Sequence, residues 1–460
     1  MKVHQINISD IKGGASIISW NLHLAFKQLG FESFVFVKHK FSDDDTVHVV
    51  NNSLFVSRWS LTLESLASII DQQKWIFDLE SKLAAFLRLL SRPGMEFRRR
   101  MGIEEFDYPA SRNLVAEDTD IIHCHVLHGG YFDLRNIQTW SSEFPVIITL
   151  HDAWLLSGHC AHSFDCERWL TGCGSCPDIT IPVAIEKDNS ALNWKRKKEI
   201  FEQSHLYVAA PCNWLMNKAE KSILRSGMRM GRVIPHGVDQ LVFRKGDRKL
   251  SRTELNIEQD ALVLLFSANG IRRNRWKDFE LMKSALELMS KCLASKKIIF
   301  LALGEDAPNE IIGNVEICYL PFRSKRDEVA LVYQAGDIYL HGARAETFPI
   351  AILEARSCGW PVVATAVGGI PEQVKGFQPF GYSEINNFDL KQATGILTPP
   401  GDANAFALAT EFLVKNESLR MQLGENASID AAERFDVNLQ TKNYLEWYQE
   451  VIANHALTKN

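Results

Sequence analysis

Short apolar runs alternate with helical segments along most of this chain, and this alternation constrains the fold more than any other feature of the sequence. In the first half, strand-like runs occupy residues 3–8, 31–37, 119–126 and 145–152. A second set occupies residues 261–267, 297–304, 315–320 and 337–341. Strands that alternate with helices build parallel sheets with helices on both faces. We therefore predict an α/β chain of two Rossmann-like, doubly wound domains that face each other across a cleft.

The composition excludes several classes of protein. With 51 basic and 56 acidic residues the formal net charge is −5, so no basic excess indicates a nucleic-acid partner. No apolar run approaches the roughly 18 residues of a membrane-spanning helix, and the first residues are too polar for a secretory signal. The cysteines outside one cluster have apolar neighbours, as expected of reduced core residues: Cys124, Cys212, Cys292, Cys318 and Cys358. We therefore expect a cytoplasmic protein.

Two carboxylates, Glu346 and Glu354, flank a predicted strand-to-helix transition. Residues 337–341 predict a buried strand, and residues 347–357 predict a helix with Pro349 in its first turn. Eight helical positions span about 12 Å, so the two carboxylates would contact different parts of one extended ligand. Free backbone N–H groups between them could bind phosphate. A nucleotide sugar has this layout, whereas spacing alone favours two solvated glutamates on a surface helix.

The same stretch resembles the Glu-x7-Glu signature of the retaining GT-B glycosyltransferases of family four. The likeness includes Gly368, Gly369, Pro371 and Glu372 downstream, and similarity to the family runs over nearly the whole chain. The resemblance implies that Glu346 binds the hydroxyls of the donor sugar and that Glu354 binds the ribose. It also implies that three residues present their backbone to the sugar: Phe348, Pro349 and Ile350. Pro349 replaces the glycine common in relatives and has no N–H to donate.

The resemblance and the alternation together predict the domain boundaries. Residues 1–240 form an N-terminal, acceptor-side domain with an insertion at 59–101 and a cysteine-rich segment at 158–178. Residues 241–433 form the nucleotide-sugar-binding domain, and the polar stretch 244–252 is interpreted as a linker. Residues 402–459 have a helical pattern. The resemblance implies that the last helix, residues 434–460, returns to the first domain.

Two features of the first half belong to the same predicted cleft. Gly13 and Gly14 lie between a strand and a helix, where they would let the backbone approach a ligand at a helix N-terminus, although a plain tight turn explains them equally well. His151 follows a central strand, and ligand sites in such sheets lie at the carboxyl ends of strands. The resemblance implies that the glycine loop faces donor phosphate and acceptor and that His151 contacts the donor sugar.

A cation-rich loop follows the first strand of the second half, at residues 269–277. Its arginines and lysine could hold a diphosphate and stabilise its charge as it leaves, whereas any single arginine there could equally be solvated. Lys277 matches the donor-phosphate lysine of the family. The arginine that accompanies this lysine in relatives is not identified by the sequence, because Arg272 and Arg273 both lie near its position.

Four cysteines cluster in the cysteine-rich segment: Cys160, Cys166, Cys173 and Cys176. In a cytoplasmic chain, clustered thiols favour a tetrahedral zinc site over disulfides. Disulfides or free thiols are the alternatives, and His159 and His162 are reserve ligands. Four thiolates would leave no open coordination position, so this zinc would be structural and no catalytic metal is expected.

The insertion at 59–101 has apolar residues at helical spacing and a basic end. The apolar set is Trp75, Ile76, Leu79, Leu83, Phe86, Leu87 and Leu90, and the basic set is Arg88, Arg92, Arg98, Arg99 and Arg100. An amphipathic segment with a basic end can lie on an anionic membrane surface. A helical insertion packed on its own domain, with a solvated basic end, is the equal alternative.

The sequence therefore predicts a metal-independent retaining glycosyltransferase. It would move a hexose-type sugar from a nucleotide diphosphate donor to a hydroxyl of a saccharide or lipid-linked saccharide acceptor, in extracellular or surface polysaccharide biosynthesis. It would act in the cytoplasm, at the inner face of the membrane if the insertion binds there. The alternatives are a sugar-nucleotide epimerase or phosphorylase of the same fold, and a zinc-stabilised binding module without catalysis.

Overall fold

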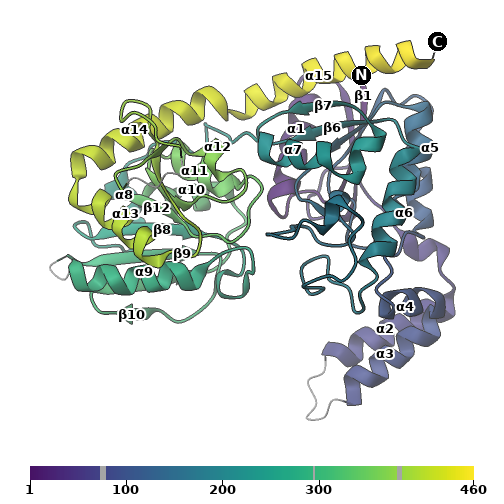
Figure 1. Ribbon diagram of the computed structural model, residues 1–460, viewed down its shortest axis with the longest axis horizontal. Helices are drawn as coiled ribbons and strands as arrows, with labels where there is room; N and C mark the ends of the chain where they lie inside the picture. Colours follow the sequence, from purple (N-terminus) through teal and green to yellow (C-terminus); the bar gives the residue numbers. More distant parts are fainter. Residues whose placement is uncertain (73–78, 294–295, 381–385, 460) are drawn as a thin grey trace. The chain divides into compact units, whose positions relative to one another are not determined.

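One parallel β-sheet and one mixed, mostly parallel β-sheet form the framework of the chain (Figure 1). The computed structural model describes residues 1–72, 79–293, 296–380 and 386–459. Unit 1 comprises Met1–Ala210, Leu215–Val233 and Leu445–Asn460, and unit 2 comprises Pro211–Trp214 and Ile234–Tyr444. Each unit contains one sheet, and helices cover both of its faces. The predicted fold class of two Rossmann-like α/β units is confirmed.

The sheet of unit 1 has seven strands in the order β3-β2-β1-β4-β5-β6-β7, and each pair of neighbours is parallel. The strands are β1 (Lys2–Ser9), β2 (Glu32–His39), β3 (Val47–Val49), β4 (Ile121–Cys124), β5 (Val146–Thr149), β6 (Leu206–Ala210) and β7 (Met228–Val233). The central strands β4, β5 and β6 are buried along their whole length, which explains their continuous apolar runs.

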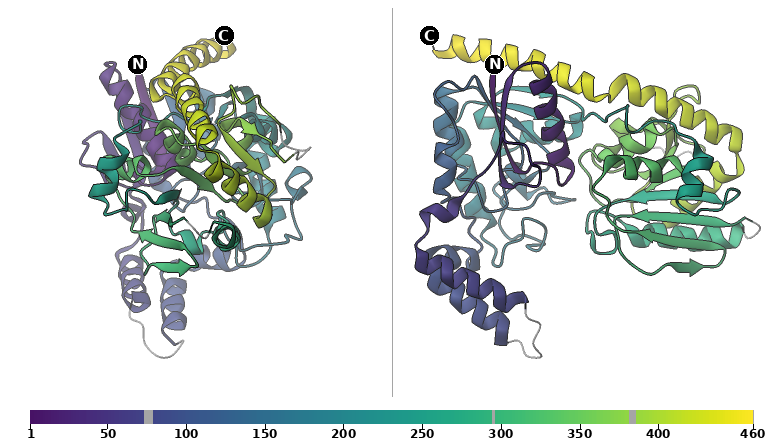
Figure 2. Two further views of the ribbon diagram at one scale, coloured as in Figure 1. Left: turned by 90° about the vertical axis from the view of Figure 1, so that its left-hand side faces the viewer. Right: turned by 180° about the vertical axis from the view of Figure 1, so that it is seen from behind.

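The helices of unit 1 follow the strand–helix alternation, with one addition. They are α1 (Gly14–Gln28), α2 (Arg58–Gln72), α3 (Leu79–Ser91), α4 (Pro93–Arg100), α5 (Asn136–Glu143) and α6 (Ser190–Glu202), and α7 (Asn213–Lys221) lies at the unit boundary. Helix α1 ends before Gly30, whose φ of +80° suits the residue after a helix. The addition is the hairpin of α2 and α3, which extends away from the sheet of unit 1 (Figure 2).

The sheet of unit 2 has eight strands in the order β10-β11-β9-β8-β12-β13-β15-β14. The strands are β8 (Leu262–Ser267), β9 (Ile298–Leu303), β10 (Glu310–Ile312), β11 (Val315–Leu320), β12 (Ile338–His341), β13 (Val362–Thr365), β14 (Gly376–Phe377) and β15 (Gly395–Thr398). The pairing of β10 with β11 is antiparallel and the other pairings are parallel. The switch in strand order lies between β8 and β12, where doubly wound sheets bind ligands.

The helices of unit 2 cover both faces of this sheet and continue into the C-terminal tail. They are α8 (Arg248–Glu254), α9 (Phe279–Cys292), α10 (Arg326–Gln334), α11 (Ile350–Ser357), α12 (Ile370–Gln373), α13 (Ala403–Lys415), α14 (Glu417–Arg434) and α15 (Val437–Lys459). Aspartate side chains cap α9 and α13, since Asp278 accepts from the Leu281 N–H at 3.3 Å and Asp402 accepts from the Ala405 N–H at 2.9 Å. The predicted helical tail is confirmed.

Three local predictions are wrong. The helix after β12 begins at Ile350 and not at residue 347, because the residues before Pro349 are restricted to extended backbone. The stretch interpreted as a linker contains α8, and its Arg252 is only 2% exposed and pairs with Asp337 at 2.7 Å. Cys292 is exposed and Cys318 is half-buried, so these two thiols are not core residues.

Across residues 1–72, 79–293, 296–380 and 386–459, no helix combines the length and apolar character needed to cross a bilayer. The predicted apolar face of the insertion includes Trp75 and Ile76, which lie outside the described residues.

Candidate active site

The carboxyl ends of the strands in unit 2 bring together a lysine, a histidine and a carboxylate. His341 is the last residue of β12, Glu346 follows it by one short loop, and Lys277 comes just before α9. The Lys277 ammonium forms an ion pair with Oε1 of Glu346, and Nε2 of His341 lies 3.2 Å from the same oxygen. A backbone bridge between Lys277 and Ala343 holds the two loops together. Two predicted site residues 69 positions apart are therefore in direct contact.

Burial sets the charge state of this cluster. It lowers the pKa of Lys277 to about 7. Burial and the neighbouring lysine hold the pKa of His341 well below its ordinary value, so its imidazole is neutral. The Tyr339 hydroxyl lies 3.3 Å from Nδ1 of His341. A hydroxyl that donates to Nδ1 leaves the proton on Nε2, which then donates to Glu346.

Two glycines, Gly368 and Gly369, let the loop after β13 approach Glu346 closely. Gly368 has φ +56°, and a Cβ there would overlap the carbonyl oxygen of Glu346. A Cβ on Gly369 would overlap the carbonyl oxygen of Thr347, which accepts a hydrogen bond from the Gly369 N–H at 3.1 Å. Neither position has room for a side chain. The paired glycines therefore fix the backbone that carries Glu346.

Glu354 lies within α11 and is half-buried. Burial raises the pKa of this carboxyl group to about 7, while Tyr333 and Arg326 act in the opposite direction. The ring of Tyr333 stacks on that of Tyr339, with centroids 5.8 Å apart. Near neutral pH, Glu354 is therefore present both as an acid that can donate a hydrogen bond and as a carboxylate that can only accept one.

Three predicted site residues lie where the chain enters α11: Phe348, Pro349 and Ile350. The Phe348 ring is buried between His236 and Phe435, with ring centroids at 5.7 and 5.8 Å, so this side chain packs inside unit 2. Pro349 is the N-cap of α11, and its carbonyl oxygen accepts a hydrogen bond from a side-chain amide of α12 at 3.0 Å. The side chain of Phe348 and the carbonyl of Pro349 therefore already have partners within unit 2.

The two candidate arginines have different surroundings. Nε of Arg272 lies 3.6 Å from a Glu305 oxygen, and its guanidinium stands 5.1 Å from the centroid of the Tyr319 ring. Arg273 is exposed, and in the described part of the chain no carboxylate oxygen lies within 4 Å of its guanidinium. The guanidinium of Arg272 therefore has partners within unit 2, Glu305 and Tyr319, and the guanidinium of Arg273 has no such carboxylate partner among the described residues.

At the corresponding edge of unit 1, a chain of hydrogen bonds ends at His151. This residue lies two positions beyond β5, and its Nε2 is 3.0 Å from Nδ1 of His125. Nε2 of His125 lies 3.2 Å from the amide oxygen of Gln5. Because an amide oxygen only accepts, His125 donates through Nε2 and its Nδ1 accepts from His151. Burial lowers the pKa of His151 to about 4, so its imidazole is neutral near pH 7.

Asp152 lies beside His151 in unit 1, and we call the group of His125, His128, His151 and Asp152 the His151 corner. Its carboxylate accepts from Nε2 of His128 at 2.8 Å and from the Trp154 N–H at 2.8 Å. A hollow of about 10 Å³ lies between these side chains, His125 and His151. That volume is about enough for one water molecule. A sugar would therefore contact this corner from outside and would not enter it.

Gly13 and Gly14 lie at the start of α1, and both are exposed. Gly13 has φ +99° and no heavy atom within 4 Å of the place where a Cβ would lie. The loop before them is held by Asp10, which is buried and accepts from the backbone N–H groups of Phe41 and Ser42 at 3.0 and 2.8 Å. The glycine loop is thus open on its outer side and fixed at its root.

The four clustered cysteines of unit 1 line one cavity of about 20 Å³ together with His159. None of them forms a disulfide. Nε2 of His159 lies 3.2 Å from Sγ of Cys176, and Sγ of Cys173 accepts from the Gly158 N–H at 3.3 Å. Within the described residues, no three His, Cys, Asp or Glu side chains are placed to hold a metal ion. The thiols therefore share a cavity, but their positions do not form a metal site.

The hairpin of α2 and α3 has an apolar outer face. Leu63, Ala67 and Ala84 are buried inside it. Other large apolar side chains are exposed, among them Trp59 at 67% and Phe86 at 53%, with Leu66, Ile69, Leu83 and Leu90. Spacings of three, four and seven residues place the exposed residues of each helix on one face.

The arginines of the insertion are paired with carboxylates. Arg99 and Arg100 lie 2.7 and 2.9 Å from Oε1 of Glu96, and these partners, Arg99 first, lower the pKa of Glu96 to about 2. The others pair with residues distant in sequence: Arg88 with Asp71, Arg92 with Glu64 and Arg98 with Glu105. The segment therefore presents fewer unpaired cations than its sequence indicates.

His341 is the main site residue that the sequence pattern did not single out. The sequence places it at the end of a buried strand and five residues before Glu346. A histidine in that position is the same signal that drew attention to His151 in the first half. Its contacts with Lys277 and Glu346 become visible only when β12 and the loop before α9 are placed side by side.

Comparison with known proteins gives matches at the level of family and fold. Residues 247–430 match the family described as "Glycosyl transferases group 1". A protein of Escherichia coli (strain K12) named for colanic acid biosynthesis, the glycosyl transferase WcaC, is 23% identical over 379 residues, which cover 79% of this chain and 83% of that protein.

Two solved structures match over almost the whole chain. Sucrose-phosphate synthase from Thermosynechococcus elongatus has a TM-score of 0.63 at 16% identity, covering 98% of this chain and 99% of that one. Anabaena HepE in complex with UDP has a TM-score of 0.58 at 17% identity, covering 98% and 100%. At these identities the likeness concerns the fold.

Proposed function

We propose that this chain, whose residues 247–430 match the group 1 glycosyl transferases and whose fold matches GT-B structures, is a retaining glycosyltransferase that uses a nucleoside diphosphate sugar. The contact between Lys277 and Glu346, with neutral His341 beside them, carries the proposal. It combines a cation for a diphosphate with a carboxylate for sugar hydroxyls at the switch point of the sheet. We propose UDP as the nucleotide because Anabaena HepE was solved with UDP.

Each polar group of the cluster has a role in this proposal. The diphosphate binds to the ammonium of Lys277 and replaces Glu346 as its partner. Glu346, released from the lysine, accepts hydrogen bonds from the hydroxyls of the donor sugar, and His341 holds it in place through Nε2. Glu354 binds the ribose hydroxyls. In unit 1, His151 orients the sugar, with its proton directed by His125 and Gln5.

The transfer step needs no nucleophile from the protein. The bond between the anomeric carbon and the diphosphate oxygen breaks, and the acceptor oxygen bonds to the same face of that carbon. The acceptor proton passes to an oxygen of the leaving diphosphate. The ammonium of Lys277 stabilises the charge that develops on the diphosphate.

Arg273 is the arginine that we assign to the diphosphate beside Lys277. The support is that Arg272 is held by Glu305 and Tyr319, whereas the exposed guanidinium of Arg273 has no carboxylate within 4 Å in the described part of the chain. A guanidinium can bind two phosphate oxygens at once. Arg273→Gln should therefore weaken UDP binding more than Arg272→Gln does.

The acceptor is proposed to be a saccharide or lipid-linked saccharide in surface polysaccharide biosynthesis. The likeness to WcaC, a protein named for colanic acid biosynthesis, supports this role. We place the enzyme at the inner face of the cytoplasmic membrane, with the apolar outer face of α2 and α3 in contact with the lipid. This contact depends on Trp59 and Phe86, because the arginines of the insertion are already paired.

The cysteine cavity is proposed to hold a structural zinc ion after small movements of its thiols. Its lining by four cysteines and His159 supports this proposal, as does backbone strain beside it, since Cys173 and Ser175 have φ of +56° and +47°. The purified protein should contain one zinc per chain, and Cys173→Ser should lower both zinc content and thermal stability. A protein that is free of zinc but fully stable would contradict the proposal.

Thermal shift with a panel of nucleotide sugars is the first test of function, because a bound donor stabilises the folded state. A stabilising donor should then be consumed only when an acceptor is present. Isomerised sugar nucleotide formed from donor alone would identify an epimerase instead. Glu346→Ala should bind the nucleotide but lose transfer, and full activity of this variant would refute the proposed site.

A further inference from the structure

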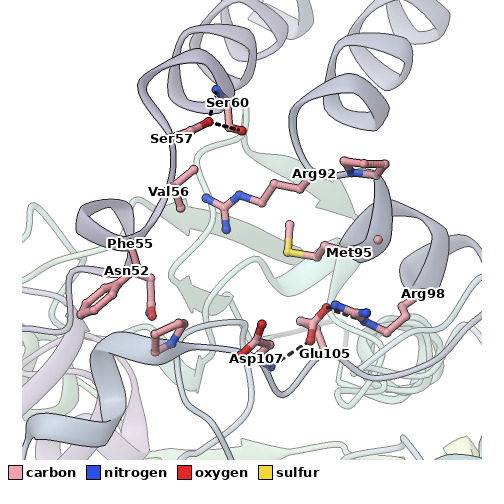
Figure 3. Close-up of a pocket in the computed structure, with 13 residues that line it drawn as sticks. Asn52, Phe55, Val56, Ser57, Ser60, Arg92, Met95, Arg98, Glu105 and Asp107 are labelled. Carbon is pink, nitrogen blue, oxygen red and sulfur yellow. Dashed lines mark hydrogen bonds and ion pairs between the residues drawn. The ribbon is translucent and has the colours of Figure 1, made fainter.

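Two adjacent hollows of unit 1 form one trough at the root of the α2–α3 hairpin. Their volumes are about 300 and 290 Å³, and they share Arg98, Glu105 and Asp107. Both are at the lower end of the size range of small-molecule sites. In the first hollow, Arg92 extends across the cavity and Met95 points into it, while Arg98 turns toward Glu105 (Figure 3). The second hollow is lined mainly by arginines.

The trough carries an excess of positive charge in a chain that is acidic overall. Five arginines line it: Arg92, Arg98, Arg112, Arg135 and Arg196. Four of them have a carboxylate partner, Arg92 with Glu64, Arg98 with Glu105, Arg112 with Asp107 and Arg135 with Asp133, which leaves Arg196 as the excess cation. The chain as a whole has a net charge of −5. An anion that enters the trough therefore gains most from Arg112 and Arg196, because the other three arginines have close carboxylate partners.

Arg196 is the central cation of the second hollow. Its guanidinium stands 4.3 Å from the centroid of the Phe106 ring, and Nη1 donates to the carbonyl oxygen of Glu104 at 2.7 Å. No carboxylate oxygen lies within 4 Å of it in the part of the chain that the structure describes. Burial lowers the pKa of Arg196, the carboxylates of Glu104 and Glu105 oppose this effect, and the positive charges of Arg135 and Arg98 add to it more weakly.

The carboxylates at the trough leave hydrogen-bond donors for a ligand. Asp107 lies 3.3 Å from Arg112 and 3.6 Å from Arg135, and Asp133 lies 3.9 Å from Arg112. Arg135 itself donates two hydrogen bonds to Asp133 at 2.8 and 2.7 Å, so it is firmly paired. Charge-assisted hydrogen bonds between nitrogen and oxygen are normally about 2.7–2.9 Å long. These longer separations show that Arg112 is only loosely paired, and its side chain is more than half exposed.

The trough is joined to the His151 corner by one layer of side chains. Glu104 accepts from the Trp154 indole N–H at 2.7 Å and pairs with the buried Lys197 at 3.0 Å. Trp154 packs on His128, whose ring centroid lies 5.5 Å away, and His128 donates to Asp152. The arginines and the proposed sugar-orienting corner therefore lie on one connected part of unit 1.

We propose that this trough binds the phosphate or diphosphate group of the acceptor. The proposal rests on the proposed transferase function and names its acceptor class, a phosphorylated saccharide, which is either soluble or linked to lipid through the same phosphate. The arginines bind the phosphate oxygens and leave the saccharide to reach the His151 corner. The trough is separate from the Lys277 cluster, which belongs to unit 2.

Pyrophosphate titrated into the full chain by calorimetry tests the proposal. The background is Lys277→Met, which removes the donor-side cation, so the result does not depend on nucleotide binding. Arg98→Gln with Arg112→Gln should weaken pyrophosphate binding at least tenfold. The control, Arg99→Gln with Arg100→Gln, changes the same charge on exposed arginines outside the trough and should leave binding unchanged. Equal binding by both pairs, or no binding by the parent, would overturn the proposal.

The folded state of each variant is checked by its thermal transition, and Arg112→Gln alone is the fallback because its side chain is exposed. Vesicles of phosphatidylcholine with phosphatidic acid then identify the source of the phosphate. Sedimentation that pyrophosphate reduces, and that the trough variant loses, assigns a lipid-linked acceptor. Pyrophosphate binding without any such effect on sedimentation assigns a soluble one. Failure of UDP binding would overturn the transferase proposal alone and leave the pyrophosphate result standing.

Discussion

In both units a histidine lies at the carboxyl-end edge of the sheet, but the two edges differ in charge: the edge of unit 1 has a neutral histidine, and the edge of unit 2 has an ion pair beside its histidine. Each edge has a histidine at or just after a central strand, His151 in unit 1 and His341 in unit 2, and burial lowers the pKa of both. In unit 1 the histidine ends a neutral chain of hydrogen bonds. In unit 2 it contacts the ion pair of Lys277 and Glu346.

From this difference we infer that the two units have different roles, although they share one fold class: unit 1 orients the sugar and unit 2 compensates the charge of the diphosphate. A neutral chain can orient a sugar hydroxyl, but it cannot compensate a diphosphate. A lysine whose pKa lies near 7 can do so, since an arriving anion favours its protonated form. We therefore expect substitutions in the unit 2 cluster to affect donor affinity and rate, and substitutions in the unit 1 chain to affect rate alone.

Glu346→Gln should have the largest effect. The amide keeps the shape of the side chain and can still accept from His341, but it loses the charge that we propose binds the sugar hydroxyls. We expect kcat to fall about 100-fold to 1000-fold, as for loss of one preorganised group in a transition state. A steady-state assay of sugar transfer, run with UDP binding by calorimetry, measures both quantities.

The control for Glu346 is Glu417→Gln, which removes a carboxylate that is 77% exposed in the same unit. It should leave transfer and UDP binding unchanged. A Glu346→Gln enzyme with normal kcat would show that the ion pair with Lys277 is structural, and the comparison between the two edges would then lose its catalytic meaning.

The second largest effect should be a loss of stability when a loop glycine, Gly368 or Gly13, is replaced by alanine. Gly368→Ala forces a Cβ against the carbonyl oxygen of Glu346 at φ +56°, whereas Gly13→Ala meets no atom within 4 Å at φ +99°. We expect losses of about 3 kcal/mol and about 1 kcal/mol in the free energy of unfolding, because only the first adds a steric overlap to the backbone strain. Thermal unfolding of the two variants, each compared with the parent, tests this ranking. Equal losses would show that the unit 2 loop can move away from Glu346.

The sequence predicts most of the longer strands because they are short apolar runs, but it does not predict β3, β10, β14 or β15, which have two to four residues each. It fails where a residue's partner is distant along the chain. The sequence predicts that Arg252 lies in a polar linker and is solvated, but in the structure it is buried and pairs with Asp337. The arginines of the insertion look like a free basic cluster in the sequence, yet Arg88 pairs with Asp71 and Arg92 with Glu64. Pairing between such distant residues is set by the fold, whereas the pairing of Arg99 and Arg100 with Glu96 follows a helical spacing that the sequence already contains.

The pH dependence of UDP binding gives a third, smaller effect. Lys277 with a pKa of about 7 loses its proton as the pH rises, so UDP affinity should fall about tenfold between pH 7 and pH 8.5, a range in which the nucleotide's own charge is nearly constant. Glu354, whose pKa is also about 7, loses its proton over the same range. Its carboxylate, which we propose accepts hydrogen bonds from the ribose, should therefore raise UDP affinity as the pH rises. Lys277→Met should therefore abolish the fall, and Glu354→Gln should steepen it. Calorimetry at four pH values measures the slopes, and a parent affinity that rises with pH would exclude Lys277 as the diphosphate cation.

The smallest predicted effect concerns the proton on His151. Gln5→Met removes the oxygen that directs His125, so His125 no longer has to present Nδ1 as an acceptor to His151. The loss of one such hydrogen bond is worth about 1 kcal/mol, so kcat should fall about fivefold while the KM for donor and the affinity for UDP stay constant. Ser33→Ala is the matched control, since it removes the hydroxyl 3.5 Å from Nε2 of Gln5 and leaves its oxygen on His125. If Gln5→Met changed UDP affinity and left kcat unchanged, His151 would belong to the groups that bind the donor. Both edges would then bind the donor, and the proposed difference in role between unit 1 and unit 2 would be wrong.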